Sequence, residues 1–410
     1  MPASPSTARA INDRLALRLF QQEGPLTAGQ LKQLTGLSRP TVADLVERLT
    51  ASGLVTVVGE AGEARRGPNA KLYGIAADRA HLAALDVRTE SVTVLVSDLV
   101  GRVLAEASVP IGDDTGTGTA VERAVTLVEH ALKEAGADRL HTVGIGAPGL
   151  IDPASGELRD TTGLPEWHRS LVAALQQRLP GARVSVENET NLAALAEQRD
   201  GAARDRDTFV LLWLGHGTGA AVVLDGVLRR GASGGTGEIG FLPVPGTVGL
   251  PSATDCEGGF HSLAGAAAVA RLAEEYGLTE EYGLTAGATG HEPRAAGAVR
   301  EAARLVAAPP AGPGTDARDA AGFLDALAGR LAVGVASVVS ILDPGCVVLG
   351  GEIGQAGGEA LAGRVSRRLR RMSPLPTEVR PGSLGGGAVL RGALLTARDR
   401  AQDELFPPAR

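Results

Sequence analysis

Residues 35–42, Thr-Gly-Leu-Ser-Arg-Pro-Thr-Val, connect two short segments whose apolar residues recur at helical spacing. Gly36 suits the end of a helix because glycine adopts a left-handed backbone without strain. Ser38 is a favoured N-cap, and Pro40 fits the first turn of the helix that follows. Two helices joined by a turn of a few residues have the spacing of a helix-turn-helix unit.

One more helix is predicted before this unit, and two strands are predicted after it. Thr27 with Gln30 three residues later forms a capping box that opens the second helix. The segments 54–58 and 71–75 are apolar and predict the strands of a hairpin. The apolar residues that predict the first helix up to Gly24 are Ile11, Leu15, Leu19 and Phe20. Those that predict the buried face of the third helix are Val42, Leu45, Val46 and Leu49.

The loop between the two predicted strands contains two arginines and looks like the wing of a winged helix-turn-helix domain. In such a domain the N-terminal residues of the third helix lie near base edges, which predicts DNA contacts for Ser38, Arg39 and Thr41. Arg65 and Arg66 are predicted to reach backbone phosphates or a narrow minor groove. The alternative is that these side chains only solvate a helix end and that the module contacts another protein.

The charge of the chain is unevenly distributed. Residues 1–76 contain nine basic and six acidic residues, whereas the rest of the chain has a net charge of -10. This asymmetry favours a nucleic-acid-binding head, because neutralisation of phosphates drives such binding. A double-stranded DNA operator is therefore the expected partner.

Length and composition limit the class of protein. The 410 residues allow two or three domains, and 44% hydrophobic with 21% charged residues excludes a wholly disordered chain. The two cysteines, Cys256 and Cys346, exclude a disulfide framework and a four-cysteine zinc site. The first ten residues lack the apolar core of a signal peptide, and the longest apolar stretch, 331–342, is interrupted by polar residues and glycine. We expect a soluble cytoplasmic protein with no membrane partner.

Strands and helices alternate after residue 76, which predicts an α/β body. We expect a head at 1–76, a first lobe at 77–200 and a second lobe at 201–410, with the last helix, from about 387, returning to the first lobe. The stretch 286–318 is the most loop-like and is expected to be a mobile insertion. The predicted strands are 82–87, 91–97, 142–147, 183–187, 208–214, 220–224 and 346–349, and the predicted helices are 120–135, 191–198, 262–276, 319–342 and a last one from 387.

A weak internal repeat supports two related lobes. A shift of 127 residues sets Leu-Asp-Val at 85–87 on Leu-Trp-Leu at 212–214, and each copy is a strand, a short loop and a second strand. The arrangement is similar to the actin-like sugar-kinase fold, in which two such loops hold the phosphates of a nucleotide. The second loop, 215–219, is rich in glycine and lets backbone N–H groups approach a phosphate. The first loop has Arg88-Thr89-Glu90 instead, whose side chains obstruct that approach.

Several motifs occur in a family-specific order: TGLSRPTV at 35–42, RGP at 66–68, GIGAPG at 144–149, LPEW at 164–167, ENETN at 187–191, GEIG at 237–240 and DPGCVVLGG at 343–351. The whole chain thereby resembles the ROK family of repressors, open reading frames and kinases. Its head places it beside the transcriptional repressors of that family, such as the xylose and N-acetylglucosamine regulators. The resemblance implies a winged helix-turn-helix domain followed by a two-lobed actin-like body, and a homodimer or a dimer of dimers.

Departures from the family pattern favour a regulator over an enzyme. The family's kinases carry a glycine-rich first phosphate loop where this chain has Arg88, and a catalytic Asp where it has Glu189. The extra methylene of Glu moves the carboxylate by roughly 1 Å, which disturbs the geometry of a general base. The family's zinc site uses a His where this chain has Phe241, so only Cys256 and His261 remain and no metal is expected. We expect no cofactor, a buried Cys256 and a solvated His261.

The resemblance implies a partly retained sugar pocket. Asn188, Glu189 and Glu238 match positions that bind sugar hydroxyls, and His261 aligns near a further one. The alternative for Asn188 and Glu189 is capping of the helix that follows. The predicted function is a transcriptional regulator of carbohydrate genes with a sugar or sugar-derivative effector. The alternatives are an ATP-dependent sugar kinase with a DNA-binding head, and a regulator whose body is a ligand-free dimerisation scaffold.

Overall fold

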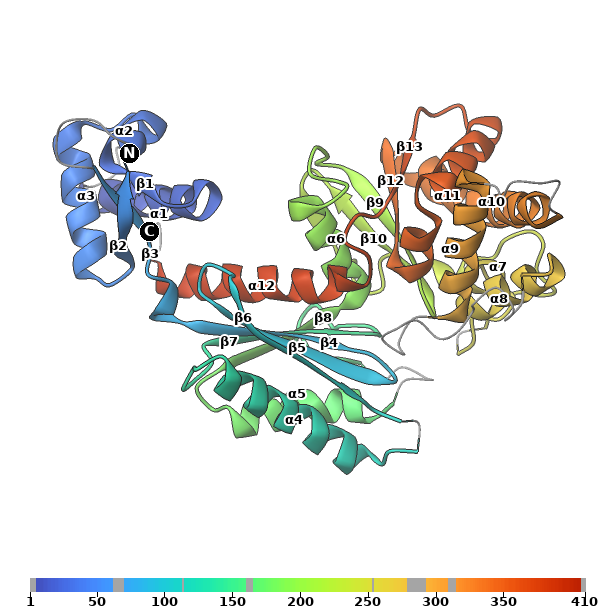
Figure 1. The fold of residues 1–410 in the computed structure, drawn as a ribbon, viewed down its shortest axis with the longest axis horizontal. Coiled ribbons are helices and arrows are strands. Elements are labelled where there is room, and N and C mark those ends of the chain that lie inside the picture. Colours follow the sequence, from blue (N-terminus) through green and yellow to red (C-terminus); the bar gives the residue numbers. More distant parts are fainter. Residues whose placement is uncertain are drawn as a thin grey trace.

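The chain forms a small head at one end, a first lobe in the middle and a second lobe at the other end (Figure 1). The structure is a computed structural model, and it describes residues 5–61, 70–112, 114–159, 165–252, 254–278, 293–308 and 315–406. Arg65 and Arg66, predicted at the wing tip, lie outside the described residues, as does Leu164 of the LPEW motif. The division of the chain into units at residues 76 and 200 stays a prediction.

The head contains three helices and a small antiparallel sheet, as a winged helix domain does. Thr27 accepts from the N–H of Gln30, and the Gln30 side chain accepts from the N–H of Thr27, so the predicted capping box is present. Gly36 ends the second helix with φ 70°, and Ser38 caps the third. The elements are α1 (Pro5–Glu23), β1 (Leu26–Thr27), α2 (Ala28–Thr35), α3 (Arg39–Ala51), β2 (Val55–Ala61) and β3 (Ala70–Ile75), with strand order β1-β3-β2.

The apolar residues that predicted α1 are buried to different extents. Ile11 and Leu15 are 46% and 40% exposed, whereas Ala16, Leu17 and Phe20 are buried in the head core. The apolar spacing predicted the helix correctly, and of its four residues Phe20 is buried and Leu19 packs partly buried against the same cluster. On α3 the four predicted residues are all buried.

The first lobe is a five-stranded sheet with helices packed against it. Strand β4 pairs antiparallel with β5 and parallel with β7, and β8 lies parallel to β7. The sheet order is β6-β5-β4-β7-β8. Its elements are η1 (Ala77–Arg79), β4 (His81–Val87), β5 (Ser91–Asp98), β6 (Val103–Pro110), α4 (Thr117–Glu134), β7 (Thr142–Ala147), α5 (Trp167–Arg178) and β8 (Arg183–Asn188). Helix α6 (Glu189–Asp200) follows β8 and lies beside the sheet of the second lobe (Figure 1).

The second lobe repeats this topology. Its sheet has the order β11-β10-β9-β12-β13, and β9 again pairs antiparallel with the next strand and parallel with the fourth. The two hairpins that the sequence repeat superposes are therefore equivalent in the two lobes. The strands are β9 (Phe209–Leu214), β10 (Thr218–Leu224), β11 (Val227–Arg229), β12 (Cys346–Gly350) and β13 (Glu378–Pro381), with η2 (Ile239–Phe241) between them. The predicted α/β fold, a winged helix head followed by a two-lobed actin-like body, is confirmed.

Helices build the outer part of the second lobe. They are α7 (His261–Ala264), α8 (Ala266–Glu275), α9 (Arg294–Ala307), α10 (Thr315–Leu342) and α11 (Gly351–Met372). The expectation that 286–318 is a mobile insertion is wrong for its described part, because α9 buries Val299 and Leu305 against the neighbouring helices. The window Ala317–Leu342 is long and apolar enough to span a membrane by composition alone. Here it packs Phe323, Leu327 and other side chains into the core of the lobe.

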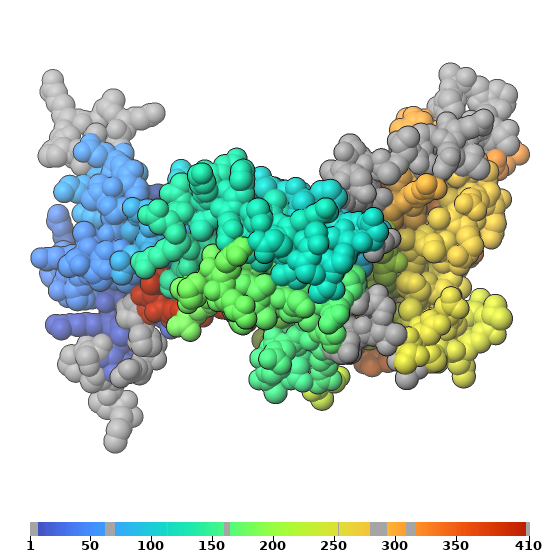
Figure 2. Space-filling view, turned by 90° about the horizontal axis from the view of Figure 1, so that it is seen from below, coloured from blue at the N-terminus to red at the C-terminus, as the bar shows by residue number. Residues whose placement is uncertain are grey.

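The last helix, α12 (Ala388–Leu405), connects the body with the head. It packs on α6, β4 and β7, begins after η4 (Gly385–Gly387) near the junction of the lobes, and runs to the head (Figure 1). In the space-filling view its end fills the gap between the head and the first lobe (Figure 2). Gln402 donates to Gln21 of α1 at 2.7 Å and to the Leu99 carbonyl at 3.2 Å, and Phe406 is buried in the hydrophobic cluster that extends from the head into the body.

Candidate functional site

The predicted DNA-contacting residues lie at the start of α3, on the side of the head that faces away from α12 (Figure 1). The Ser38 hydroxyl lies 2.8 Å from that of Thr41 and accepts from the Thr41 N–H. Arg39 is exposed and forms no ion pair within the described ranges. By contrast, Arg48 on the same helix pairs with Asp13 of α1 at 2.6 Å. The head thus uses Arg48 to hold its helices together and leaves Arg39 available to a ligand.

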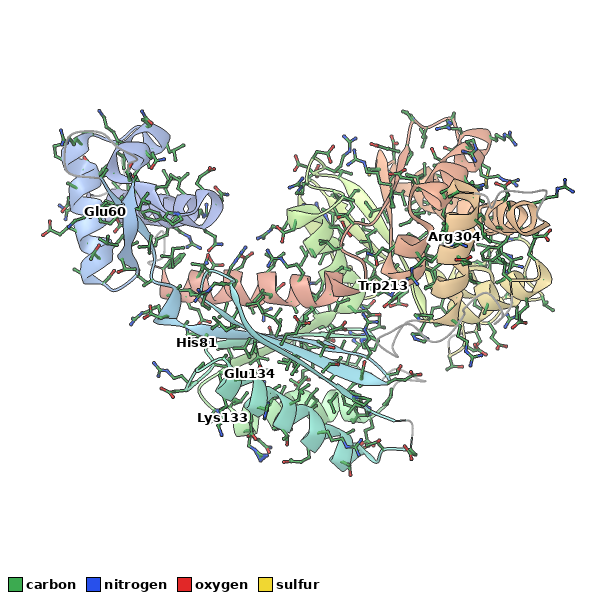
Figure 3. All side chains as sticks on the ribbon, in the orientation of Figure 1. Glu60, His81, Lys133, Glu134, Trp213 and Arg304 are labelled. Carbon is green, nitrogen blue, oxygen red and sulfur yellow. The ribbon has the colours of Figure 1, made fainter. Side chains whose placement is uncertain are left out.

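The four residues predicted to bind a sugar line one cavity of about 670 Å³ between the lobes. Asn188 and Glu189 stand where β8 ends and α6 begins, Glu238 precedes η2, and His261 opens α7. Trp213, near the end of β9, also lines this cavity and lies at the junction of the lobes (Figure 3). A cavity of this size with a few convergent polar groups is typical of small-molecule sites.

Asn188 has a structural role in this cavity wall. Its Oδ1 accepts from the backbone N–H groups of Thr190 and Asn191, so the side chain caps α6. Its Nδ2 donates to the Gly149 carbonyl and to the Glu189 carboxyl, each at 3.0 Å. The capping alternative is therefore correct for Asn188, and a sugar contact of this residue stays a prediction.

Glu238 is held by a close approach of two backbone segments. Gly237 has φ 91°, and a Cβ at this position would lie 1.8 Å from the Ala220 carbonyl oxygen. The Ala220 N–H donates to the Gly237 carbonyl at 2.7 Å. Only glycine fits here, because both the left-handed backbone and the available space exclude a side chain. The GEIG motif thereby places Glu238 in the cavity wall opposite Glu189.

The pKa values of the two carboxyls of the cavity are both raised. Burial raises the pKa of Glu189 from 4.5 to about 8, and the nearby carboxylates of Glu238 and Asp86 add to the shift. Burial also raises the pKa of Glu238. At neutral pH a protonated Glu189 can donate a hydrogen bond to a ligand hydroxyl.

We expect the stability difference between the Glu189→Gln variant and the wild type to grow with pH. At pH values between about 4.5 and about 8 only the unfolded chain loses the Glu189 proton. The wild type therefore loses up to about 1.4 kcal/mol of stability per pH unit over this window, whereas the amide has no proton to lose. Melting temperatures measured across the window should rise in the variant relative to the wild type, and a constant difference would contradict the assignment.

Arg88 fills the place of the first phosphate loop. Its Nε donates to Asp86 at 3.0 Å, its Nη1 to Glu352 at 2.5 Å and its Nη2 to the Gly386 carbonyl at 3.2 Å. Asp86 belongs to the first lobe, whereas Glu352 opens α11 in the second lobe and Gly386 precedes α12. One guanidinium thus joins both lobes and the base of α12. The sequence identified Arg88 as a departure but gave no sign of Glu352 or Gly386.

The residues at the family's zinc position do not fit a metal. Phe241 is 38% exposed and lines the cavity, and Cys256 and His261 line it too. In the part of the chain that the structure describes, no group of three or more His, Cys, Asp and Glu side chains could hold a metal ion. Cys256 is half-buried rather than buried, and His261 is half-buried rather than solvated, with its pKa lowered by burial. Both expectations about burial were wrong, because α7 and its preceding loop fold over the cavity edge.

A winged helix head on a two-lobed actin-like body with an interlobe cavity defines a recognisable class of protein. A model of the ROK family matches residues 82–400, and a model of the MarR family matches residues 12–66. The chain therefore belongs to the ROK family and carries a MarR-type helix-turn-helix head.

Relatives of the chain include sugar repressors. The xylose repressor of Caldicellulosiruptor bescii is 27% identical over 240 residues, which are 58% of this chain and 59% of the repressor. The DNA-binding transcriptional dual regulator NagC of Escherichia coli is 28% identical over 248 residues, 58% of each chain. The chain thus spans less than two thirds of the length of these curated relatives.

Solved structures match more of the chain. A ROK family transcriptional regulator described as a homologue of the Escherichia coli MLC protein has a TM-score of 0.71 at 20% identity and covers 98% of both chains. A ROK family glucokinase from Streptomyces griseus, solved with glucose and AMPPNP, has a TM-score of 0.61 at 27% identity and covers 78% of this chain and 99% of its own. The chain is homologous to ROK repressors, and its fold is also that of ROK kinases.

Proposed function

We propose that this protein is a cytoplasmic, one-component transcriptional repressor whose head binds an operator and whose interlobe cavity binds a sugar or sugar derivative. The observation that carries the proposal is that one helix, α12, connects the cavity-forming lobes to a head whose Arg39 is exposed and unpaired among the described residues. Two heads of a homodimer would place Ser38, Arg39 and Thr41 in successive major grooves of a palindromic site. The xylose and NagC relatives support this assignment of class.

The site favours effector binding over phosphoryl transfer. Arg88 occupies the first phosphate loop and neutralises Asp86, so a nucleotide would have to displace an ion pair. Glu189, with a pKa of about 8, is mostly protonated at neutral pH and is then no general base. A protonated carboxyl and the cap residue Asn188 instead offer hydrogen bonds to sugar hydroxyls. A kinase would require Arg88 to leave its ion pairs and Glu189 to lose its proton.

An effector can regulate operator binding only if it favours one arrangement of the lobes. The cavity walls come from both lobes, and the Arg88 contacts join the lobes to the residues before α12. A ligand that moves the lobes would therefore shift the base of α12, whose far end packs on α1 of the head. This path gives the sugar a mechanical route to the operator-binding residues.

The test of the proposed function is selection of genomic fragments by the purified full-length protein, followed by sequencing. We expect an enriched palindrome at about 0.1 M salt, where specific binding survives. Replacement of Arg123, an exposed arginine on α4, should leave the selected fragments unchanged. If no fragment is enriched, the repressor assignment is wrong.

A panel of sugars then tests the cavity. A sugar that binds the native state raises the melting temperature in a concentration-dependent way. We expect the shift to disappear in the Glu238→Gln and Glu189→Ala variants, and sugar-dependent consumption of ATP to be absent. Enrichment of a palindrome without any thermal shift would instead support a body that acts only as a dimerisation scaffold.

A further inference from the structure

A second cavity lies between the head and the body, away from the interlobe site. It has a volume of about 790 Å³, within the range of small-molecule sites. Its walls come from α1 of the head and from α6 and α12 of the body. Five arginines and three aspartates line it, which leaves an excess of two positive charges: Arg14, Arg18, Arg199, Arg391, Arg398, Asp200, Asp399 and Asp403.

Three of these arginines have carboxylate partners. Arg14 pairs with Asp403, Arg199 lies 2.7 Å from Asp399, and Arg391 lies 2.6 Å from Asp200. The two remaining arginines, Arg18 and Arg398, have no acidic residue of their own in the cavity. Arg18 is exposed at the cavity wall, and Arg398 is only 3.6 Å from Asp399, which Arg199 already holds.

Arg398 is the most buried of these arginines. Its side chain is only 12% exposed, and its Nε is buried without a hydrogen-bond partner among the described residues. Burial lowers the pKa of Arg398, although the Asp399 carboxylate opposes this shift. A buried guanidinium is normally paired and hydrogen-bonded, because an unsatisfied buried charge is unfavourable.

We propose that this junction cavity is a binding site for a small phosphorylated metabolite, whose phosphate Arg18 and Arg398 would hold. A planar guanidinium offers paired N–H donors that match phosphate oxygens. A phosphate would neutralise the excess of two positive charges and satisfy the free donors of Arg398. The three aspartates do not oppose this, because each is already neutralised by its own arginine.

The position of the cavity favours a small molecule over DNA. The start of α3 lies on the side of the head away from α12, whereas the junction cavity lies between α1 and the body (Figure 1). A duplex that contacts Arg39 therefore lies across the head from this cavity. A bound anion would instead join Arg18 of the head to Arg398 of the body and fix the angle between them.

Titration calorimetry of the full-length protein with inorganic pyrophosphate tests the proposal. We expect saturable binding of one pyrophosphate per chain at about 0.1 M salt. The Arg398→Gln and Arg18→Gln variants should each bind about tenfold more weakly, whereas Arg123→Gln, on the surface of α4, should bind as the wild type does. Arg18 is exposed and unpaired in the described structure, so we expect Arg18→Gln to fold. This variant therefore tests the proposal even if Arg398→Gln does not fold.

Two results would overturn the proposal. One is the absence of saturable pyrophosphate binding, or equal binding by the wild type and Arg18→Gln. The other is unchanged pyrophosphate binding together with a weaker salt dependence of operator binding in Arg18→Gln, which would assign these arginines to the DNA backbone. The calorimetry contains no DNA. It therefore tests the junction cavity independently of whether the operator selection succeeds.

Discussion

The Arg88→Met variant should lower the free energy of unfolding by about 3 to 5 kcal/mol. Arg88 is the shared partner of Asp86 and Glu352, whose side chains are each only 8% exposed. Its removal takes the Arg88 charge away from two nearly buried carboxylates, and methionine keeps most of the side-chain volume. Urea denaturation at neutral pH, followed by circular dichroism, measures the difference.

A surface arginine that also pairs with two carboxylates provides the control. Arg178 joins Glu122 and Glu129 at 2.8 and 3.1 Å, but its side chain is 44% exposed. Arg178→Met should therefore lower the stability by less than about 1 kcal/mol. Adding Glu352→Gln to Arg88→Met should recover part of the loss, since one buried charge is then removed. Equal effects of the two single substitutions would show that the Arg88 contacts do not hold the lobes together.

Local signals in the sequence predicted much of the fold. The Thr27 and Gln30 capping box, the turn at Gly36 and the Ser38 cap are set by neighbouring residues, and the structure has all three. The buried strands of the two sheets are continuous apolar runs, as expected where helices cover the sheet. The sequence repeat also matched the two hairpins, because the equivalent strands are both buried and both apolar.

Two helices of the second lobe, α9 and α11, were not predicted. Helix α11 contains closely spaced glycines, which disfavour an isolated helix. They are needed for packing, since a Cβ at Gly354 would lie 2.5 Å from the Leu349 carbonyl oxygen. Helix α9 is rich in alanine, which favours a helix, and its buried residues, among them Ala298 and Ala302, lie on one face, so a local signal was present and was missed. Tertiary contacts rather than local propensity stabilise the glycine-containing α11.

The sequence predicted the candidate sites only where a motif marked the residues. Motif positions brought Asn188, Glu189, Glu238 and His261 to one cavity, as the resemblance implied. The Arg88–Glu352 contact joins residues 264 positions apart, and the junction cavity combines residues from both ends of the chain. Such pairs depend on how the lobes and the head pack, so no local spacing in the sequence could predict them.

The Arg39→Ala variant should lose specific operator binding while the protein stays folded. A bidentate arginine contact to a base contributes about 1 to 3 kcal/mol, and a dimer on a palindrome makes the contact twice. The affinity for the operator should therefore fall by a factor on the order of 30 to 10,000. Alanine is tolerated because Arg39 is exposed and unpaired in the described head, and Ser38 still caps α3.

Titration of labelled operator and of an unrelated duplex at the same salt concentration separates base contacts from backbone contacts. Loss confined to the operator would assign Arg39 to a base edge, whereas equal weakening on both duplexes would assign it to a phosphate. An unchanged operator affinity, with an unchanged melting temperature, would show that α3 is not the recognition helix. Arg48 of the same helix pairs with Asp13 within the head. Arg48→Ala should therefore lower the melting temperature but leave the preference for the operator over the unrelated duplex unchanged.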